Sequence, residues 1–170
     1  MNGLTTCFKG WRLAAAVLCL GVASLPSIAQ QSAYRYSLPA GWSRTQDDSG
    51  ETLVPSTEPA GTVQAILLAP KPLAADFNVQ FDAERSALEA QWGLSAPLPT
   101  PPQRGRTADG PYAAHFASYA SEGGPRYMSF LAIGRAGKFS MLVFVAASDE
   151  AFNRTAPQVT QFWQGLQLAP

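Results

Sequence analysis

The sequence predicts an α+β fold in which antiparallel strands form one sheet and helices pack on it. Three observations support this prediction. Short strands with alternating side chains, separated by turn residues, run up to Pro70. Residues 77–92 then change to helical spacing. Finally, three long apolar runs with hairpin turns between them lead to a closing helix near the C-terminus.

The N-terminus has the features of a secretory leader. Lys9 and Arg12 give a short positive segment, residues 13–25 form an apolar run that is short for a membrane span, and small residues follow up to Ala29. We therefore expect a signal peptide that is cut after Ala29. An uncleaved membrane anchor is the alternative, and Pro26 disfavours it because it interrupts the apolar run.

Removal of residues 1–29 leaves a single domain, residues 30–170, without a thiol, because Cys7 and Cys19 both lie in the leader. This excludes thiol catalysis, disulfide exchange and zinc–thiolate sites in the exported domain. The full chain has 12 basic and 12 acidic residues, so neither nucleic acid nor an anionic membrane surface is a favoured partner. We expect a periplasmic or secreted protein with no stable membrane span after cleavage.

The first part of the exported domain predicts a meander of short strands. Alternating bulky and polar side chains predict a strand at residues 34–38, and the next strand is expected to begin at Trp42. Residues 46–50 have the composition of a turn, because Asp and Ser bond their own backbone and Gly accepts positive φ. Two further strands are expected at residues 52–54 and 62–68.

Residues 77–92 predict an amphipathic helix, because their apolar side chains recur at multiples of four and seven. Asp76 is the expected N-cap, and Gly93 provides the stop at the C-terminal end. On this spacing Glu84 and Glu89 are expected to face outward. This is the most clearly marked helix in the sequence.

The second half of the domain is rich in strands. The four prolines of residues 94–103 predict an extended connector, which we interpret as a crossing loop within one domain. Three runs of aromatic and aliphatic residues follow, separated by segments of hairpin composition, at residues 111–121, 126–134 and 139–147. These runs are expected to form the centre of the sheet.

A helix is predicted after the last of these strands. Ser148 can cap it, and Pro157 predicts a break, since proline suits the first turn of a helix rather than its interior. The apolar face then continues up to Gly165. A short last strand at residues 166–168 is expected to pair back onto the sheet.

This order of elements resembles a known superfamily. Leu38-Pro39-Ala40-Gly41-Trp42 follows the first strand, and Gly165-Leu166-Gln167-Leu168 ends the closing helix. Over residues 34–168 the chain is similar to the superfamily that joins PsbP-like photosystem proteins, Ran-binding Mog proteins and small exported bacterial proteins. The resemblance implies a three-layer α/β/α sandwich with a central antiparallel sheet. It also implies binding or assembly factors without a shared catalytic centre, and it supplies no site residues to carry over.

Catalytic side chains are scarce. His115 is the only imidazole, so a catalytic triad would need it together with Ser118, Ser121, Ser129 or Ser140 as nucleophile. None of these serines lies in a nucleophile-elbow pattern, and a lone strand histidine is usually a packing residue. One histidine without cysteines also gives a weak basis for a metal site. We therefore predict neither a catalytic residue nor a metal ligand, and a hydrolase using His115 is the least favoured hypothesis.

Two groups of acidic residues have alternative interpretations. Residues 47–51 contain three carboxylates for a calcium site, but they lack the length and later Glu of a calcium loop, so a solvated hairpin turn is favoured. The carboxylates of the first helix are candidates for glycoside hydrolysis, although around one amphipathic helix they mark its wet face: Asp76, Asp82, Glu84 and Glu89. No phosphate-binding glycine pattern is present, and no cofactor is predicted.

Aromatic and basic side chains are the remaining recognition candidates. The tyrosines at alternate strand positions are candidates to line a groove: Tyr34, Tyr36, Tyr112 and Tyr119. Four arginines are candidates to bind an anionic partner, although arginines in hairpins and loops usually meet only water: Arg104, Arg106, Arg126 and Arg135. Trp92 and Trp163 have helical core spacing and are expected to pack against the sheet.

Three functions remain open on these grounds. The first is a non-enzymatic binding or assembly protein of the bacterial envelope that contacts another envelope or exported protein. The second is a small-ligand binder with an aromatic-lined cleft between sheet and helix. The third is the hydrolase that depends on His115. The sequence does not predict the oligomeric state.

Overall fold

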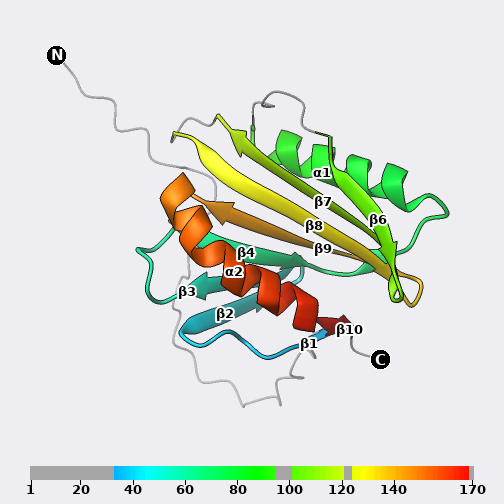
Figure 1. Ribbon diagram of the computed structural model, residues 1–170, viewed down its shortest axis with the longest axis horizontal. Coiled ribbons are helices and arrows are strands. Elements are labelled where there is room, and N and C mark those ends of the chain that lie inside the picture. Colours follow the sequence, from blue (N-terminus) through cyan, green and yellow to red (C-terminus); the bar gives the residue numbers. More distant parts are fainter. Residues whose placement is uncertain (1–32, 95–100, 121–123, 169–170) are drawn as a thin grey trace, which may run out of the picture. The chain divides into compact units, whose positions relative to one another are not determined.

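The computed structural model describes residues 33–94, 101–120 and 124–168. The predicted signal peptide, most of the proline-rich connector and Ser121 lie outside these residues. The described residues form an antiparallel sheet with two helices, which agrees with the predicted α+β class (Figure 1). Neither helix has the length and apolar character needed to cross a membrane.

The main sheet has eight antiparallel strands. Seven of them run from one edge to the other in the order β2 (Trp42–Asp47), β3 (Gly50–Pro55), β4 (Val63–Leu68), β9 (Lys138–Ala146), β8 (Arg126–Arg135), β7 (Gly110–Tyr119) and β6 (Gln103–Thr107). The eighth, β5 (Lys71–Pro72), pairs with β9 beside the end of β4. The three apolar runs predicted for the centre form the consecutive neighbours β7, β8 and β9.

Two strand predictions need correction. The segment expected as a strand at residues 34–38 is a strand only at β1 (Tyr34–Arg35), and the last strand, β10 (Gln167–Leu168), pairs with β1 instead of the main sheet. The proline-rich connector ends earlier than expected, because β6 begins at Gln103. The sequence pattern does not reveal β6, because all five of its residues are exposed and no apolar residue alternates along it. Its hydrogen bonds to β7 define the strand instead.

The two helices pack on opposite faces of the sheet (Figure 1). Successive side chains of a strand point to opposite faces, and β9 shows the consequence. Leu142 and Phe144 belong to the cluster that contains α2 (Asp149–Gly165), whereas Met141 and Val143 belong to the cluster that contains α1 (Phe77–Gln91). We call these the α2 face and the α1 face.

The sequence predicts α1 correctly at both ends. The Asp76 carboxylate accepts hydrogen bonds from the backbone N–H groups of Asn78 and Val79, as an N-cap does. Gly93 lies just beyond the helix with a φ of 61°, a left-handed conformation that favours glycine. The prediction for Glu89 is wrong: its carboxylate lies largely buried against the sheet, where it accepts a hydrogen bond from Tyr119.

The helix α2 is continuous, so the break predicted near Pro157 is absent. The Ser148 hydroxyl accepts a hydrogen bond from the backbone N–H of Ala151, which starts the helix eight residues before the proline. Proline removes one internal hydrogen bond from a helix, at a cost of about 3 kcal/mol. Burial of Ala151, Val159 and Phe162 against the sheet offsets this cost, because tertiary packing supplies most of a helix's stability.

Candidate binding groove

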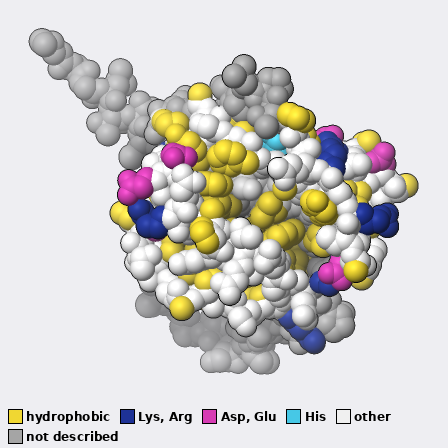
Figure 2. All heavy atoms as spheres, viewed as in Figure 1, with side chains coloured by type: hydrophobic (Ala, Val, Ile, Leu, Met, Phe, Trp, Pro, Cys, Tyr) yellow, Lys and Arg dark blue, Asp and Glu magenta, His cyan; other side chains and the backbone are white. Residues whose placement is uncertain are grey.

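The helix α2 covers only part of its sheet face. It packs mainly over β4 and β9 and contacts part of β8, whereas several side chains on the same face of β7 stay exposed. On β7, which is paired on both sides, Phe116 is 47% exposed and Tyr112 is 37% exposed, and such exposure of large apolar side chains is unusual in an inner strand. Figure 2 shows hydrophobic side chains gathered on this face beside α2, around a hollow. Two features of this surface are separable, a groove and an aromatic patch.

The groove lies between the C-terminal half of α2 and strands β7 and β8, with a volume of about 330 Å³. Its floor is apolar and includes Leu131 and Ile133 of β8. Trp163 comes from the α2 wall and Tyr112 from the opposite side. Clefts of this size, mostly apolar and open on one side, are typical of small-molecule sites in proteins.

A glycine positions the Tyr112 side chain. Gly105 of the edge strand β6 pairs with Tyr112, and a Cβ atom at Gly105 would lie 2.6 Å from the Tyr112 ring. The ring therefore occupies the space that any other side chain would take, and covers the backbone of β6. This contact lets Tyr112 form the outer wall of the groove.

The rim of the groove carries one ion pair. Arg135 at the end of β8 lies 2.6 Å from the Asp109 carboxylate, measured between Nη2 and Oδ1. Its Nη1 also donates to the carbonyl oxygen of Leu166, the C-cap of α2, over 3.5 Å. Arg135 thus ties the β6–β7 hairpin to the end of the helix, and its charge is already balanced by a carboxylate.

Two hydroxyl groups lie at the inner end of the groove. The Tyr34 hydroxyl donates to the carbonyl oxygen of Leu68 over 2.7 Å, and burial raises the pKa of this phenol to about 12. Ser140 is only 2% exposed, and its Oγ has no hydrogen-bond partner among the described residues, although it lies close enough to Tyr34 to oppose that increase in pKa. An unpartnered buried hydroxyl is costly, because it loses water without gaining a replacement.

The aromatic patch lies at the other end of α2. The Phe116 ring of β7 is 4.8 Å from the Phe152 ring of α2, centroid to centroid. Phe152 is in turn 4.8 Å from the buried Phe144. Phe116 is therefore an exposed ring on a rigid aromatic support, an arrangement that favours contact with an apolar partner surface.

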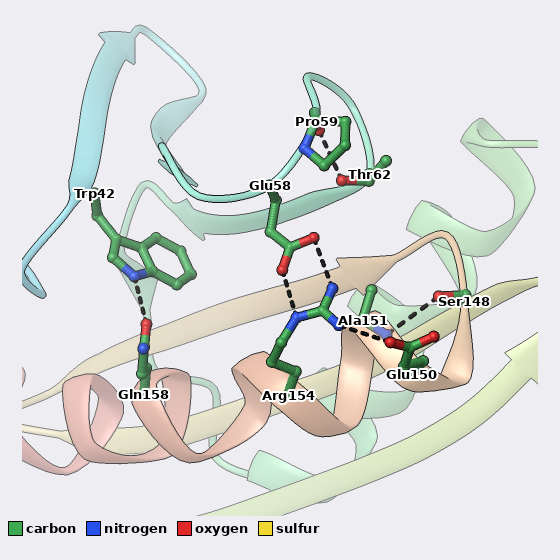
Figure 3. Close-up of polar contacts among 9 residues, drawn as sticks. All are labelled: Trp42, Glu58, Pro59, Thr62, Ser148, Glu150, Ala151, Arg154 and Gln158. Carbon is green, nitrogen blue, oxygen red and sulfur yellow. Dashed lines mark hydrogen bonds and ion pairs between the residues drawn. The ribbon is translucent and has the colours of Figure 1, made fainter.

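Polar contacts hold α2 in place on the side away from the groove (Figure 3). Arg154 makes two hydrogen bonds to the Glu58 carboxylate, of 2.8 and 2.9 Å, and a third of 3.0 Å to Glu150. The hydrogen bond to Arg154 lowers the pKa of Glu58. The Trp42 indole N–H donates to Gln158 over 2.8 Å. These contacts fix the helix that forms one wall of the groove.

The predicted tyrosines do not form one site. Tyr112 lines the groove, and the buried Tyr34 reaches its inner end. Tyr36 is half-buried, packs edge-on against Phe162 and donates a hydrogen bond to Glu51. Tyr119 is fully buried on the α1 face, away from the groove. Of these four tyrosines, only Tyr112 is exposed.

Among the predicted arginines, Arg135 lines the groove, whereas Arg104 and Arg106 lie on the other face of the sheet. Arg104 pairs with Ala113, whose side chain faces α1, and Arg106 occupies the same side of β6 two residues later. Arg104 binds both carboxylate oxygens of Asp82 over 2.8 Å, and its guanidinium lies 5.8 Å from the centre of the Phe81 ring. The sequence predicts loop positions for Arg104 and Arg106, but both lie in the edge strand β6.

His115 is separated from the described candidate nucleophiles. It is buried on the α1 face, where burial and the charge of Arg85 lower its pKa, opposed by Glu89 and Asp82. Strand alternation places three candidate serines on the α2 face: Ser118, Ser129 and Ser140. The sheet itself therefore lies between the imidazole and these hydroxyls.

The acidic candidates have structural partners. Lys71 binds Glu84 over 2.6 Å, and Arg85 and Tyr119 both bind Glu89. Asp47 accepts from the N–H groups of Ser49 and Gly50, so its turn is closed by its own side chain. Within the described ranges, no three His, Cys, Asp or Glu side chains gather as metal ligands would.

Sequence reasoning missed Ser140, Asp109 and Phe116 as parts of this surface, and expected only packing from Trp163. Trp163 does pack against the α2 cluster, and it lines the groove as well. Phe116 carried a signal, since it alternates with the buried His115 along one strand. Ser140 carried none, because only the packing of other segments around it shows that its hydroxyl has no partner.

No family model matches the sequence, and no curated protein matches it. Several solved structures are similar to this chain. The solution structure of cyanobacterial PsbP (CyanoP) from Synechocystis sp. PCC 6803 is similar over 88% of this chain and 99% of that chain, with a TM-score of 0.57 and 11% identity. The Ran-binding protein Mog1p of Saccharomyces cerevisiae is similar over 80% of this chain and 90% of its own, with a TM-score of 0.55 and 10% identity.

The chain has the PsbP-like fold. A third structure with this fold is LpqN, which is involved in cell envelope biogenesis of Mycobacterium tuberculosis. It is similar over 81% of this chain and 83% of its own, with a TM-score of 0.55 and 14% identity. At these identities the PsbP-like fold is what the proteins share, and the function has to be argued from the groove and the patch.

Tyrosines with raised pKa values predict that this PsbP-like domain loses stability at alkaline pH. Burial raises the pKa of Tyr34, and burial together with the Glu51 contact raises that of Tyr36, each from 10.0 to about 12. Both phenols stabilise the fold below pH 10.0, and this contribution is lost as the pH rises to about 12. For the buried Tyr34 the loss is roughly 2–3 kcal/mol.

Burial and the hydrogen bond to Glu89 also raise the pKa of Tyr119. We therefore expect tyrosinate absorbance to show three late-titrating groups in the folded protein, Tyr34, Tyr36 and Tyr119. Tyr34→Phe should remove one of them and make the decrease in stability at high pH shallower. Tyr112→Phe is the control, because it leaves all three late-titrating groups in place. A titration in which Tyr34→Phe changes neither the late absorbance step nor the pH dependence of unfolding would contradict the assignment.

Proposed function

We propose that the chain is an exported, non-enzymatic binding protein of the bacterial envelope, and that its partner is another envelope or exported protein. The observation that supports this proposal most directly is the exposed Phe116 ring, which packs on Phe152 and Phe144 on a face that α2 covers only in part. Large exposed aromatic side chains on rigid supports contribute much of the binding energy at protein interfaces.

The separation of catalytic groups supports a role without chemistry. The imidazole of His115 and the described candidate serines lie on opposite faces of the sheet. The carboxylates of α1 bind basic, phenolic or backbone groups of the same domain. These groups are therefore positioned for structure and not for proton transfer to a substrate.

The comparisons support the proposed location. LpqN has the same fold and is involved in cell envelope biogenesis, and this chain begins with the features of a signal peptide. We therefore propose a periplasmic or secreted protein. Helices on both faces of the sheet also support the three-layer α/β/α arrangement implied by the family resemblance.

An affinity capture tests the role of the patch. The tagged chain, exported by its bacterial host, is used to capture proteins from envelope extract, and the captured protein is identified, purified and measured again with purified components. We expect Phe116→Ser to weaken this binding by about tenfold or more, because a central aromatic contact is lost. Val79→Ser is the matched control, because Val79 is an exposed apolar residue of α1, on the other face.

Two results would contradict the proposal. One is equal binding by both variants. The other is catalytic turnover by the purified wild-type protein that stops when His115 is replaced by alanine. A folded, fully exported Phe116→Ser protein with a normal melting temperature is required for either conclusion.

A second candidate function is small-ligand binding in the groove. The observation that favours it is the Ser140 hydroxyl, which is buried at the inner end of a mostly apolar groove and forms no well-oriented hydrogen bond in the described part of the chain. A protein partner on the Phe116 patch and a ligand in the groove use different residues, so the two functions are compatible.

A further inference from the structure

The groove has apolar walls and an apolar floor, and it carries hydroxyl groups at its inner end. The ligand class inferred from this chemistry deepens the small-ligand function proposed above and rests on it. Its walls carry the aromatic rings of Tyr112 and Trp163, and its floor is aliphatic. Flat apolar compounds gain from contact with two such rings, because both faces of the compound leave water. These aromatic walls therefore favour a flat ring compound over an extended polar one.

The inner end of the groove offers hydrogen bonding without charge. Ser140 has a buried hydroxyl there that lies near the Tyr34 phenol but forms no well-oriented hydrogen bond among the described residues, and Tyr34 remains protonated at neutral pH. The one cation that lines the groove, Arg135, is already paired with Asp109 over 2.6 Å. A charged ligand would lose its hydration in the groove without meeting an unpaired opposite charge.

We propose that the groove binds a small, uncharged ring compound that carries one hydroxyl group, and that this hydroxyl is bound by Ser140. The volume of about 330 Å³ is at the small end of the range for ligand sites, which fits a compound of two fused rings. Binding would give the Ser140 hydroxyl a hydrogen-bond partner. The ligand would therefore gain affinity by removing the cost of a buried hydroxyl without a hydrogen bond.

The test uses three naphthalene compounds and the intact exported domain. We measure the affinity of 2-naphthol, naphthalene and naphthalene-2-carboxylate at neutral pH, from the change in ligand or tryptophan fluorescence. We expect 2-naphthol to bind most tightly, naphthalene to bind about five- to tenfold more weakly for lack of one neutral hydrogen bond, and the carboxylate to bind weakest.

The variants assign the hydrogen bond. Ser140→Ala should lower the affinity for 2-naphthol by the same factor and leave that for naphthalene unchanged. Its melting temperature should not fall, because the wild-type hydroxyl has no partner to lose among the described residues. Ser118→Ala is the control, because this serine is exposed on β7 and does not line the groove. Tyr112→Ala should weaken both ligands alike.

The outcomes separate the two proposals. If none of the three compounds binds, the small-ligand function fails together with this inference. If the carboxylate binds more tightly than 2-naphthol, or Ser140→Ala has no effect on 2-naphthol, the groove still binds ligands but the assignment of an uncharged hydroxyl compound to Ser140 is overturned. Binding that Tyr112→Ala leaves unchanged would place the ligand outside the groove and overturn it as well.

Discussion

Replacing Phe81 by alanine is expected to lower the free energy of unfolding by about 3–5 kcal/mol, the usual cost of removing a buried phenylalanine side chain. Phe81 is 0% exposed and packs in the cluster between α1 and the sheet. Its ring also supports the guanidinium of Arg104 at 5.8 Å. The loss is large because this rigid core can refill the cavity only in part. Urea unfolding of the purified domain measures it.

The matched control for Phe81→Ala lies two residues earlier on the same helix. Val79 is 64% exposed, and Val79→Ala should change stability by less than about 0.5 kcal/mol, as surface substitutions usually do. The two substitutions share the helix and the replacement residue, and differ in burial. Similar losses from both would show that α1 does not pack on the sheet as described.

Replacing Gly110 by alanine is expected to cost roughly 3 kcal/mol or more, because two costs combine there. The φ of Gly110 is 145°, a conformation that side chains rarely adopt. A Cβ atom would also lie 1.9 Å from the carbonyl oxygen of Gly134, which is backbone and cannot rotate away. The β6–β7 hairpin must therefore shift, and it carries Asp109 and Tyr112 of the groove.

Gly61→Ala separates the two costs. Gly61 also has a positive φ, of 81°, but a Cβ atom there would meet nothing within 4 Å. Only the cost of the backbone conformation then remains, at about 1–2 kcal/mol. We expect Gly110→Ala to be clearly more destabilising in urea unfolding, and to weaken 2-naphthol binding at temperatures where the protein is still folded. Equal losses would contradict the close approach to Gly134.

The architecture was largely predictable because local patterns and global packing agree. The helical spacing of α1, its Asp76 cap and the hairpins between β7, β8 and β9 all carry signals within short windows of sequence. The edge strand β6 carries none, since its side chains are all exposed. Pro157 misled the prediction of α2, because packing outweighed the local cost of proline.

The candidate site was less predictable, because which face a side chain occupies depends on register between distant segments. Tyr112 and Arg104 both come from the β6–β7 hairpin, yet Tyr112 pairs with Gly105 on the α2 face and Arg104 pairs with Ala113 on the α1 face. A shift of one residue would exchange these faces. The position of α2, which decides what stays uncovered, depends on contacts such as that between Glu58 and Arg154, 96 residues apart.

The outermost strands β2 and β6 bear on how copies of the molecule meet in a crowded compartment. A strand at the border of a sheet offers unpaired backbone groups that another chain can extend into an aggregate. Here both borders are hydrophilic along most of their length, with guanidinium groups at Arg44 on one side and at Arg104 and Arg106 on the other. Polar and charged side chains at a border disfavour such pairing, because they would lose water at the junction. The protein can thus expose an aromatic patch on one face of the sheet, while the hydrophilic edge strands β2 and β6 disfavour edge-to-edge pairing between copies.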